Sequence, residues 1–241
     1  MLNSKKIIKS SKGILICATI LSALLSFSSC VGYKNIVYKD VDETFSGDSV
    51  TKICIDLSFG NFTISTSKDD NFKIEAKDVP ENFAVGVDDD TFRIDFNNKK
   101  NYDLKKLEKA NIKLYVPEDV YEKIEINSGA ASGSISGISG EDVDISCGKG
   151  YIDITDMNAS EPVEINCGVG NIDVNDSIFD GLNLELGIGS FVYNGTINGD
   201  INIKNGIGSV TLNLENDEDE FKDKYDIDVE TQNHAKITFN N

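Results

Sequence analysis

The sequence contains no tryptophan, three prolines, one histidine (His234) and one arginine (Arg93) among its 241 residues. Catalysis by Ser-His-Asp or Cys-His groups would depend on His234, and no motif surrounds that residue. The five cysteines show neither a Cys-x-x-Cys pair nor the Cys/His spacing of a zinc site. Eight tyrosines and no tryptophan offer few rings on which a carbohydrate-active enzyme could stack sugars. The composition therefore predicts a protein that is not an enzyme and has no cofactor.

The sequence also has no excess of basic residues. The chain has 23 basic and 41 acidic residues, a net charge of −18. Residues 1–29 contain four lysines and no acid, so the remainder has 19 basic and 41 acidic residues and a net charge of −22. Such a body repels nucleic acid, because both carry negative charge. We therefore expect no nucleic-acid partner.

No apolar run is long enough to span a bilayer comfortably as a helix. The longest, Ile14–Phe27, has fourteen residues and follows a lysine-rich start, which is typical of a signal peptide. It ends in Phe27-Ser28-Ser29-Cys30, which resembles a bacterial lipobox. We predict a lipoprotein-type signal peptide over 1–29, lipidation of Cys30, a tether over 30–49, and a body at the extracytoplasmic face of the cell membrane. An uncleaved anchor and a cleaved secreted form are the alternatives.

Helical periodicity is rare in the rest of the chain, with the short segment Asp103–Ala110 as an exception. Apolar residues instead alternate in short runs, which predicts an all-β protein. The expected early strands read ICIDL, NFTIS, NFKIE, FAVGV, TFRIDF and IKLYV. Pro117 marks a break before a repeat region. The acidic run Glu215–Glu220 is expected to be a solvated loop.

The repeats contain a Gly-x-Gly between two apolar alternations. Their first glycines, Gly148, Gly168, Gly187 and Gly206, are 20, 19 and 19 residues apart, and a degenerate copy surrounds Gly129. This period predicts a β-solenoid with about 19–20 residues per coil, with a β-sandwich as the alternative. The repeat domain would cover 50–241, with repeats over about 124–214 and capping strands over 225–239. The glycines predicted at the corners, where we expect positive φ, are Gly148, Gly150, Gly168, Gly170, Gly187, Gly189, Gly206 and Gly208.

Stacked coils would align equivalent apolar residues into inward columns that form one core. The first predicted column is Ile126, Ile145, Ile165, Leu184 and Ile203. The second is Ile135, Ile152, Ile172, Phe191 and Val210. The third is Ile154, Val174, Tyr193 and Leu212, and the fourth is Ile138, Met157, Ile178 and Ile197.

The segments YVPEDVYEKIEI, ISCGKGYIDITD and INCGVGNIDVND resemble the putative adhesin family of bacterial β-strand repeat-containing domains of unknown function. The resemblance covers about residues 50–241. It implies a surface-exposed, lipid- or membrane-anchored β-repeat protein, and it implies no catalytic residues.

Outward acids would stack in neighbouring coils. Glu125, Asp144 and Glu164 would form one column, and Asp153 and Asp173 another. Like charges about 4.8 Å apart destabilise each other. We expect a solvated acidic face, with a bound Ca²⁺ as the alternative.

Cys147 and Cys167 would occupy equivalent inward positions in adjacent coils. We expect two buried thiols, with a disulfide as the alternative. Cys54 would point outward from its strand, with no obvious partner.

The predicted function is that of a non-catalytic, exported cell-surface lipoprotein that binds a surface ligand, a protein or a glycan, through a rigid β-repeat surface. One alternative is an envelope scaffold or sensory accessory that holds a membrane protein. Another is a carbohydrate-active β-helix enzyme using Asp153 and Asp173.

Overall fold

The computed structural model describes residues 37–96, 109–232 and 234–240. Cys30, the signal peptide and most of the helical candidate Asp103–Ala110 lie outside these residues. Within them, no helix combines the length and apolar character needed to cross a membrane. The predicted tether is wrong in part, because Tyr38–Ser46 forms strand β1. Val41 of this strand is buried and Phe45 packs edge-on against Phe92, which fixes the segment to the sheet.

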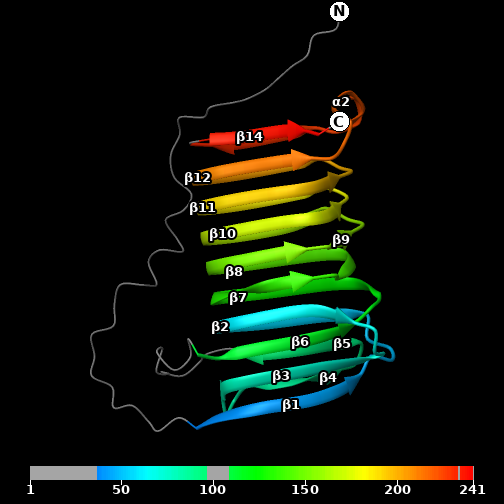
Figure 1. The fold of residues 1–241 in the computed structure, drawn as a ribbon, viewed down its shortest axis with the longest axis vertical. Helices are drawn as coiled ribbons and strands as arrows, with labels where there is room; N and C mark the ends of the chain where they lie inside the picture. The colour runs from blue at the N-terminus through cyan, green and yellow to red at the C-terminus, as the bar shows by residue number, and fades with distance from the viewer. Residues whose placement is uncertain (1–36, 97–108, 233, 241) are drawn as a thin grey trace, which may run out of the picture.

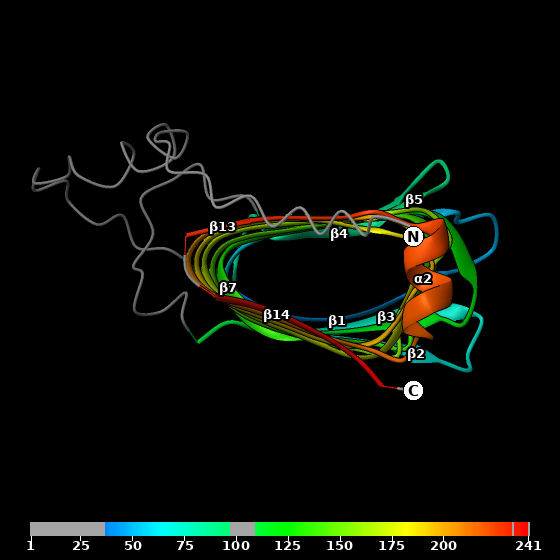
Figure 2. The ribbon, with the colours of Figure 1, turned by 90° about the horizontal axis from the view of Figure 1, so that it is seen from above.

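The described chain is a flattened β-solenoid (Figures 1 and 2). Each long strand runs along one broad face, bends at a corner and returns along the opposite face, and in β8, β10, β11 and β12 the corner is a Gly-x-Gly. We call these halves the first and second legs, and the bend the glycine edge. The strands of this kind are β2 (Lys52–Ser67), β7 (Val120–Ser136), β8 (Ser139–Thr155), β10 (Val163–Phe179), β11 (Leu182–Ile197) and β12 (Ile201–Leu214). They pair in parallel, which confirms the solenoid predicted from the period.

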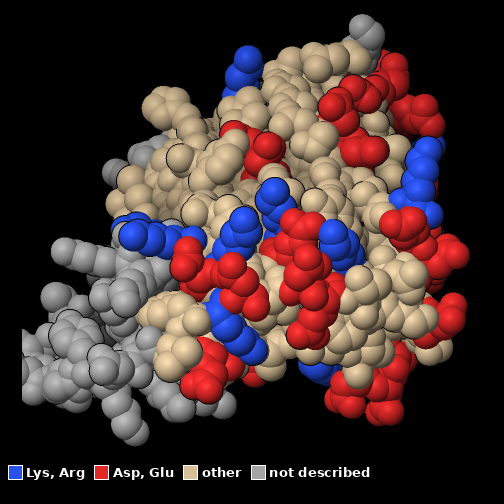
Figure 3. Space-filling view, turned by 60° about the horizontal axis from the view of Figure 1, so that its bottom comes forward, with Lys and Arg blue, Asp and Glu red and all other residues tan. Residues whose placement is uncertain are grey.

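The N-terminal end departs from chain order. β2 lies between β7 on one side and a split coil on the other, whose legs are β5 (Thr91–Phe96) and β6 (Asn111–Pro117). Antiparallel strands complete this end: β4 (Ala84–Asp88) pairs with β5 on the first face, while β3 (Asn71–Pro80) pairs with β6 and β1 on the second. Basic and acidic side chains lie side by side on this end of the molecule (Figure 3).

The C-terminal end is also a split coil. β13 (Ile227–Thr231) pairs with the first leg of β12, and β14 (His234–Phe239) pairs with its second leg. The helix α2 (Glu218–Lys224) connects β12 to β13 and lies over the end of the stack (Figure 2). The two-residue strand β9 (Asn158–Ala159) lies in the turn between β8 and β10.

Helix α2 corrects the prediction of a loop over Glu215–Glu220. Asp217 caps the helix, because its carboxylate accepts a hydrogen bond of 2.9 Å from the Glu220 N–H. The acidic residues fall in the first turn, where their negative charges are stabilised by the positive end of the helix dipole. Phe221 is buried and its ring contacts those of Tyr225 and Phe239. The helix therefore covers part of the core with an apolar side chain.

The core consists of the predicted columns, with two corrections. Ile135 is aligned with Ile154 rather than with Ile152, because the 19-residue offset between β7 and β8 places Gly133 opposite Ile152. Ile178 is 45% exposed, although the prediction placed it inside. The register shifts between Asn175 and Ser177, since Asp176 has a φ of 51° and adds a residue there. Phe179 fills the inward position instead.

Close packing between coils, more than backbone conformation, requires the glycines of the glycine edge. Of the eight predicted, only Gly189 and Gly208 have positive φ, at 145° and 140°. At Gly150 a Cβ would lie 2.0 Å from the Ala131 carbonyl oxygen, and at Gly170 one would lie 2.1 Å from the Gly150 carbonyl oxygen. The bend therefore brings each of these glycines onto the backbone of the preceding coil, and this contact leaves no room for a side chain.

Candidate functional site

The two broad faces of the stack differ in charge over β7–β12. We call the outward side chains of the first legs the charged face. They include Lys123, Glu125, Asp142, Asp144, Glu164, Glu185 and Lys204. We call the outward side chains of the second legs the polar face. They are Ser132, Ser134, Ser136, Tyr151, Asp153, Thr155, Asn171, Asp173, Asn175, Ser190, Val192, Asn194, Ser209, Thr211 and Asn213. The charged residues of this set are Asp153 and Asp173, and a third acid, Asp176, is exposed beside it at the register shift of β10.

The predicted acidic stack on the charged face is in register, since Glu125 and Glu164 both pair with Asp144. A lysine lies beside it. The Lys123 ammonium donates to Asp142 at 2.8 Å and to Asp144 at 2.9 Å, and these hydrogen bonds raise the pKa of Lys123. Among the described residues, no group of three or more His, Cys, Asp or Glu side chains is arranged to hold a metal ion.

Sequence reasoning overlooked Lys123 as the counter-ion of this stack. Its spacing was a usable signal, since Lys123 precedes Glu125 by two residues and Asp142 precedes Asp144 by two. Residues two apart in a strand share a face, and the 19-residue period then places Lys123 opposite Asp142.

We expect Lys123→Gln to lower the free energy of unfolding by up to about 1 kcal/mol at low salt, because the ion pairs are partly exposed. The folded pKa of Lys123 is raised, so its contribution is fully present below about pH 10.4 and is lost as pH rises through the folded value. Urea unfolding at two salt concentrations measures the loss of stability, and its repetition at rising pH measures the pH dependence. Equal losses in low and high salt would contradict an electrostatic role.

Asp153 and Asp173 are paired in register, as predicted. They lie on the open polar face, where the Tyr151 hydroxyl donates to Asp173 at 2.9 Å. This hydrogen bond raises the pKa of Tyr151 to about 12. His234 lies exposed in β14 and Arg93 lies in β5, near opposite ends of the stack, so these two residues are not brought together.

Amide ladders order the polar face. The Asn194 amide donates to the Asn175 side-chain oxygen at 2.7 Å, and the Asn213 amide donates to that of Asn194 at 2.7 Å. Nearer the glycine edge, the Asn171 side-chain oxygen accepts from both the N–H and the hydroxyl of Ser190, at 3.0 Å and 2.8 Å. These bonds connect successive coils and hold the amides in one orientation.

The cysteines occupy the predicted positions. Cys147 and Cys167 are aligned in β8 and β10 as free, buried thiols. The hydrogen bond with Cys147, together with burial, raises the pKa of Cys167. Cys54 is half-buried and pairs in register with Arg93 and Glu125, and burial raises the pKa of its thiol.

We expect iodoacetamide to leave Cys147 and Cys167 unmodified in the native protein and to modify both once urea unfolds it, because the two side chains are only 2% and 4% exposed and the reagent cannot reach them. Cys54 should react slowly, and its rate should keep rising above about pH 8.5, since its pKa is raised. Peptide mapping by mass spectrometry measures the extent of modification at each cysteine separately. Rapid native modification of Cys167 would contradict this assignment.

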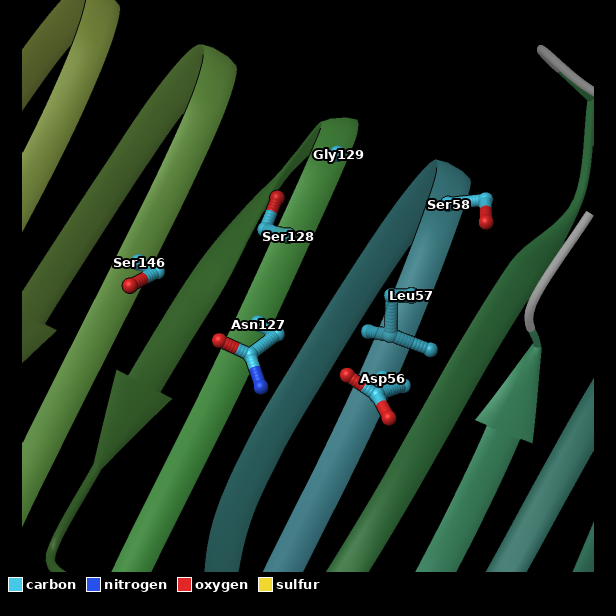
Figure 4. Close-up of a pocket in the computed structure, with 7 residues that line it drawn as sticks. All are labelled: Asp56, Leu57, Ser58, Asn127, Ser128, Gly129 and Ser146. Atoms are coloured by element: carbon cyan, nitrogen blue, oxygen red, sulfur yellow. The ribbon is translucent and has the colours of Figure 1, made fainter.

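One shallow depression opens between β2, β7 and β8 (Figure 4). Its lining is Asp56, Leu57, Ser58, Asn127, Ser128, Gly129 and Ser146. Its volume of about 240 Å³ is below the roughly 300–1,000 Å³ of pockets that enclose a small molecule. The Ser128 hydroxyl already donates to the Ala131 carbonyl at 3.3 Å. The polar face is therefore a more extensive candidate contact surface than this depression.

The family model described as Toastrack DUF4097 matches residues 50–240. Among curated proteins no match was found. Among solved structures, the chain is similar to a putative cell adhesion protein from Clostridium sporogenes, at 14% identity and a TM-score of 0.47, over 84% of this chain and 100% of that one. It is also similar to a putative adhesin from Bacteroides fragilis, at 13% identity and a TM-score of 0.42, over 84% of this chain and 97% of that one.

Proposed function

The chain belongs to the Toastrack DUF4097 family, and from that premise we propose that it is a non-catalytic binding module of the cell surface. It is exported and held at the extracytoplasmic face of the cell membrane by a lipid on Cys30. Its polar face binds an uncharged, polar surface of a protein or a glycan. Adhesion is the role that such a module performs when its ligand lies on another surface.

The observation that carries this proposal is the polar face. It is flat because the second legs of successive coils pair in parallel, in register apart from the shift at Asp176. Its hydroxyl and amide groups can both donate and accept hydrogen bonds, and the ladders through Asn194 hold them in place. A surface that is ordered before binding loses little side-chain entropy when a ligand arrives, which favours affinity.

The charge distribution supports the choice of an uncharged ligand. A net charge of −18 disfavours anionic partners, and the polar face has no lysine or arginine between β7 and β12 to offset it. Cationic partners would be drawn to the charged face, which contains most of the carboxylates of those coils. Neutral glycans and uncharged protein surfaces remain the chemistry that the polar face fits.

Protease shaving of intact cells tests the location. We expect the native chain to be cell-bound and cleaved from outside, and the Cys30→Ser variant to escape into the medium. A native protein that is cell-bound but resists shaving would overturn the surface role and favour a partner within the membrane.

A glycan array and a protein array, probed with the full chain, test the binding face. Thr211→Lys places a charge on the polar face, and Asn183→Lys places one on the charged face as the matched control. We expect the first variant to lose the signals of the native chain and the second to retain them. Equal loss in both variants would contradict the assignment to the polar face.

A further inference from the structure

A ridge of aliphatic side chains runs along the glycine edge and lies outside the polar face. The middle residues of three successive Gly-x-Gly corners, Val169, Ile188 and Ile207, are 38%, 48% and 56% exposed. They are aligned in register, with Lys149 next in line below Val169. Glycines flank each of them, so the side chains stand out from the bend with no neighbour on their own coil to cover them. Aligned exposed aliphatic side chains mark an interaction surface more than scattered ones do.

The charge of this edge differs from that of the chain. The corner segments are 127–132, 146–151, 166–171, 185–190 and 204–209. They contain two lysines, Lys149 and Lys204, and one acid, Glu185, so their net charge is +1, whereas that of the chain is −18. The Lys204 ammonium also lies 3.0 Å from the Glu185 carboxylate. The glycine edge therefore does not repel an anionic surface, although the protein as a whole does.

The described chain also begins at this edge. β6 begins at Asn111, which is paired with Asn61 just after the bend of β2, so β6 runs away from the glycine edge. β3 is antiparallel to β6 and β1 is antiparallel to β3, so β1 runs in the same direction as β6. β1 therefore starts on the glycine-edge side, as Figure 1 shows at its left. Cys30 precedes Tyr38 by eight residues, which can span at most about 26–29 Å. A lipid on Cys30 would hold this edge, rather than the opposite one, close to the bilayer.

We infer that the ridge of Val169, Ile188 and Ile207 rests on the lipid bilayer, with Lys149 facing anionic headgroups. This inference relies on the proposed lipid anchor. The anchor keeps the ridge at a high effective concentration near the surface, so a weak apolar contact is sufficient. A ridge one side chain wide is much smaller than the roughly 800 Å² per partner that a specific protein interface buries, which disfavours a second copy as the occupant. The polar face then stands upright and open to ligands.

Photo-crosslinking in cells tests the contact on the full chain. A benzophenone amino acid replaces Ile188, or replaces Val120 as the matched control. Val120 is 63% exposed at the start of β7, on the side opposite the glycine edge. We expect phospholipid adducts from position 188 and few from position 120. Equal labelling at both positions, or protein adducts alone at position 188, would overturn the inference.

A vesicle assay separates failure of the ridge from failure of the anchor. The Cys30→Ser protein that cells release into the medium is mixed with vesicles of phosphatidylcholine and phosphatidylglycerol, with and without Val169→Asn, Ile188→Asn and Ile207→Asn together. We expect the triple change to reduce vesicle binding about tenfold or more, and Val120→Asn to leave it unchanged. Release of the Cys30→Ser variant from cells reports on the anchor, while loss of vesicle binding on the triple change reports on the ridge. A triple variant that binds vesicles as well as its parent would overturn the ridge contact even where the anchor holds.

Discussion

Gly189→Ala should destabilise the protein by about 4 kcal/mol or more, which places it among the most damaging single substitutions. Gly189 has a φ of 145°, and an added Cβ would lie 1.6 Å from the Gly170 carbonyl oxygen of the neighbouring coil. A residue held in such a conformation costs about 1–3 kcal/mol. The clash adds to this cost, because β10 and β11 would have to separate at the bend. Urea unfolding followed by far-UV circular dichroism measures the loss.

Gly86→Ala is the matched control. Gly86 lies in β4, does not have positive φ, and has no atom within 4 Å of the position where a Cβ would stand. In a strand, alanine is favoured over glycine by roughly 0.5–1 kcal/mol, so this variant should be unchanged or slightly more stable. If both variants lost similar stability, the close approach of the coils would not explain why glycine occupies position 189.

Phe221→Ala should open the C-terminal end of the stack at a cost of about 3–5 kcal/mol, because it removes a buried ring. The ring contacts Tyr225 and Phe239, and Lys222 lies over the Phe239 ring. Without the Phe221 ring, α2 no longer packs on the core. The apolar interior at this end would then be exposed beside β13 and β14, which among the described strands each pair with β12 alone and so have outer edges that other chains can join. Light scattering during size-exclusion chromatography should then detect oligomers.

The control for this prediction is Asp223→Ala, an exposed position in the same helix. It preserves the packing of Phe221 and replaces aspartate with a better helix former, so stability and size should not change appreciably. A Phe221→Ala protein that remains a monomer with native stability would show that α2 is dispensable as a cap.

The fold of the repeat region was predictable because its glycines and its apolar residues recur with the same period of 19–20 residues. The period alone aligned Glu125 with Asp144 and Cys147 with Cys167, and the structure has both alignments. It failed at Asp176, where one residue in the left-handed region shifts the register and exposes Ile178. A single extra residue leaves the period almost unchanged, so the pattern could not reveal it.

Long-range pairing was beyond prediction. Nothing in the local sequence of β2 indicates that β7 will pair on one side and β5 and β6 on the other. Helix α2 was missed for a different reason, because its acidic start resembles a solvated loop and its one buried side chain, Phe221, gives no periodic signal. The polar face was predictable only in outline, since its lack of lysine and arginine emerges once the second legs are separated from the first.

The place of β2 between later segments has a consequence for how the chain folds. β2 is the first long strand along the chain, yet all the strands that pair with it come later, from residues 91–136. Coils β7 to β12, in contrast, each pair with the coil before them, apart from the short β9. The slow step in folding should therefore be the closure of residues 38–136, whose contacts are distant in sequence. Once β7 has docked, the remaining coils can add one after another as they emerge, each using the previous coil as its template.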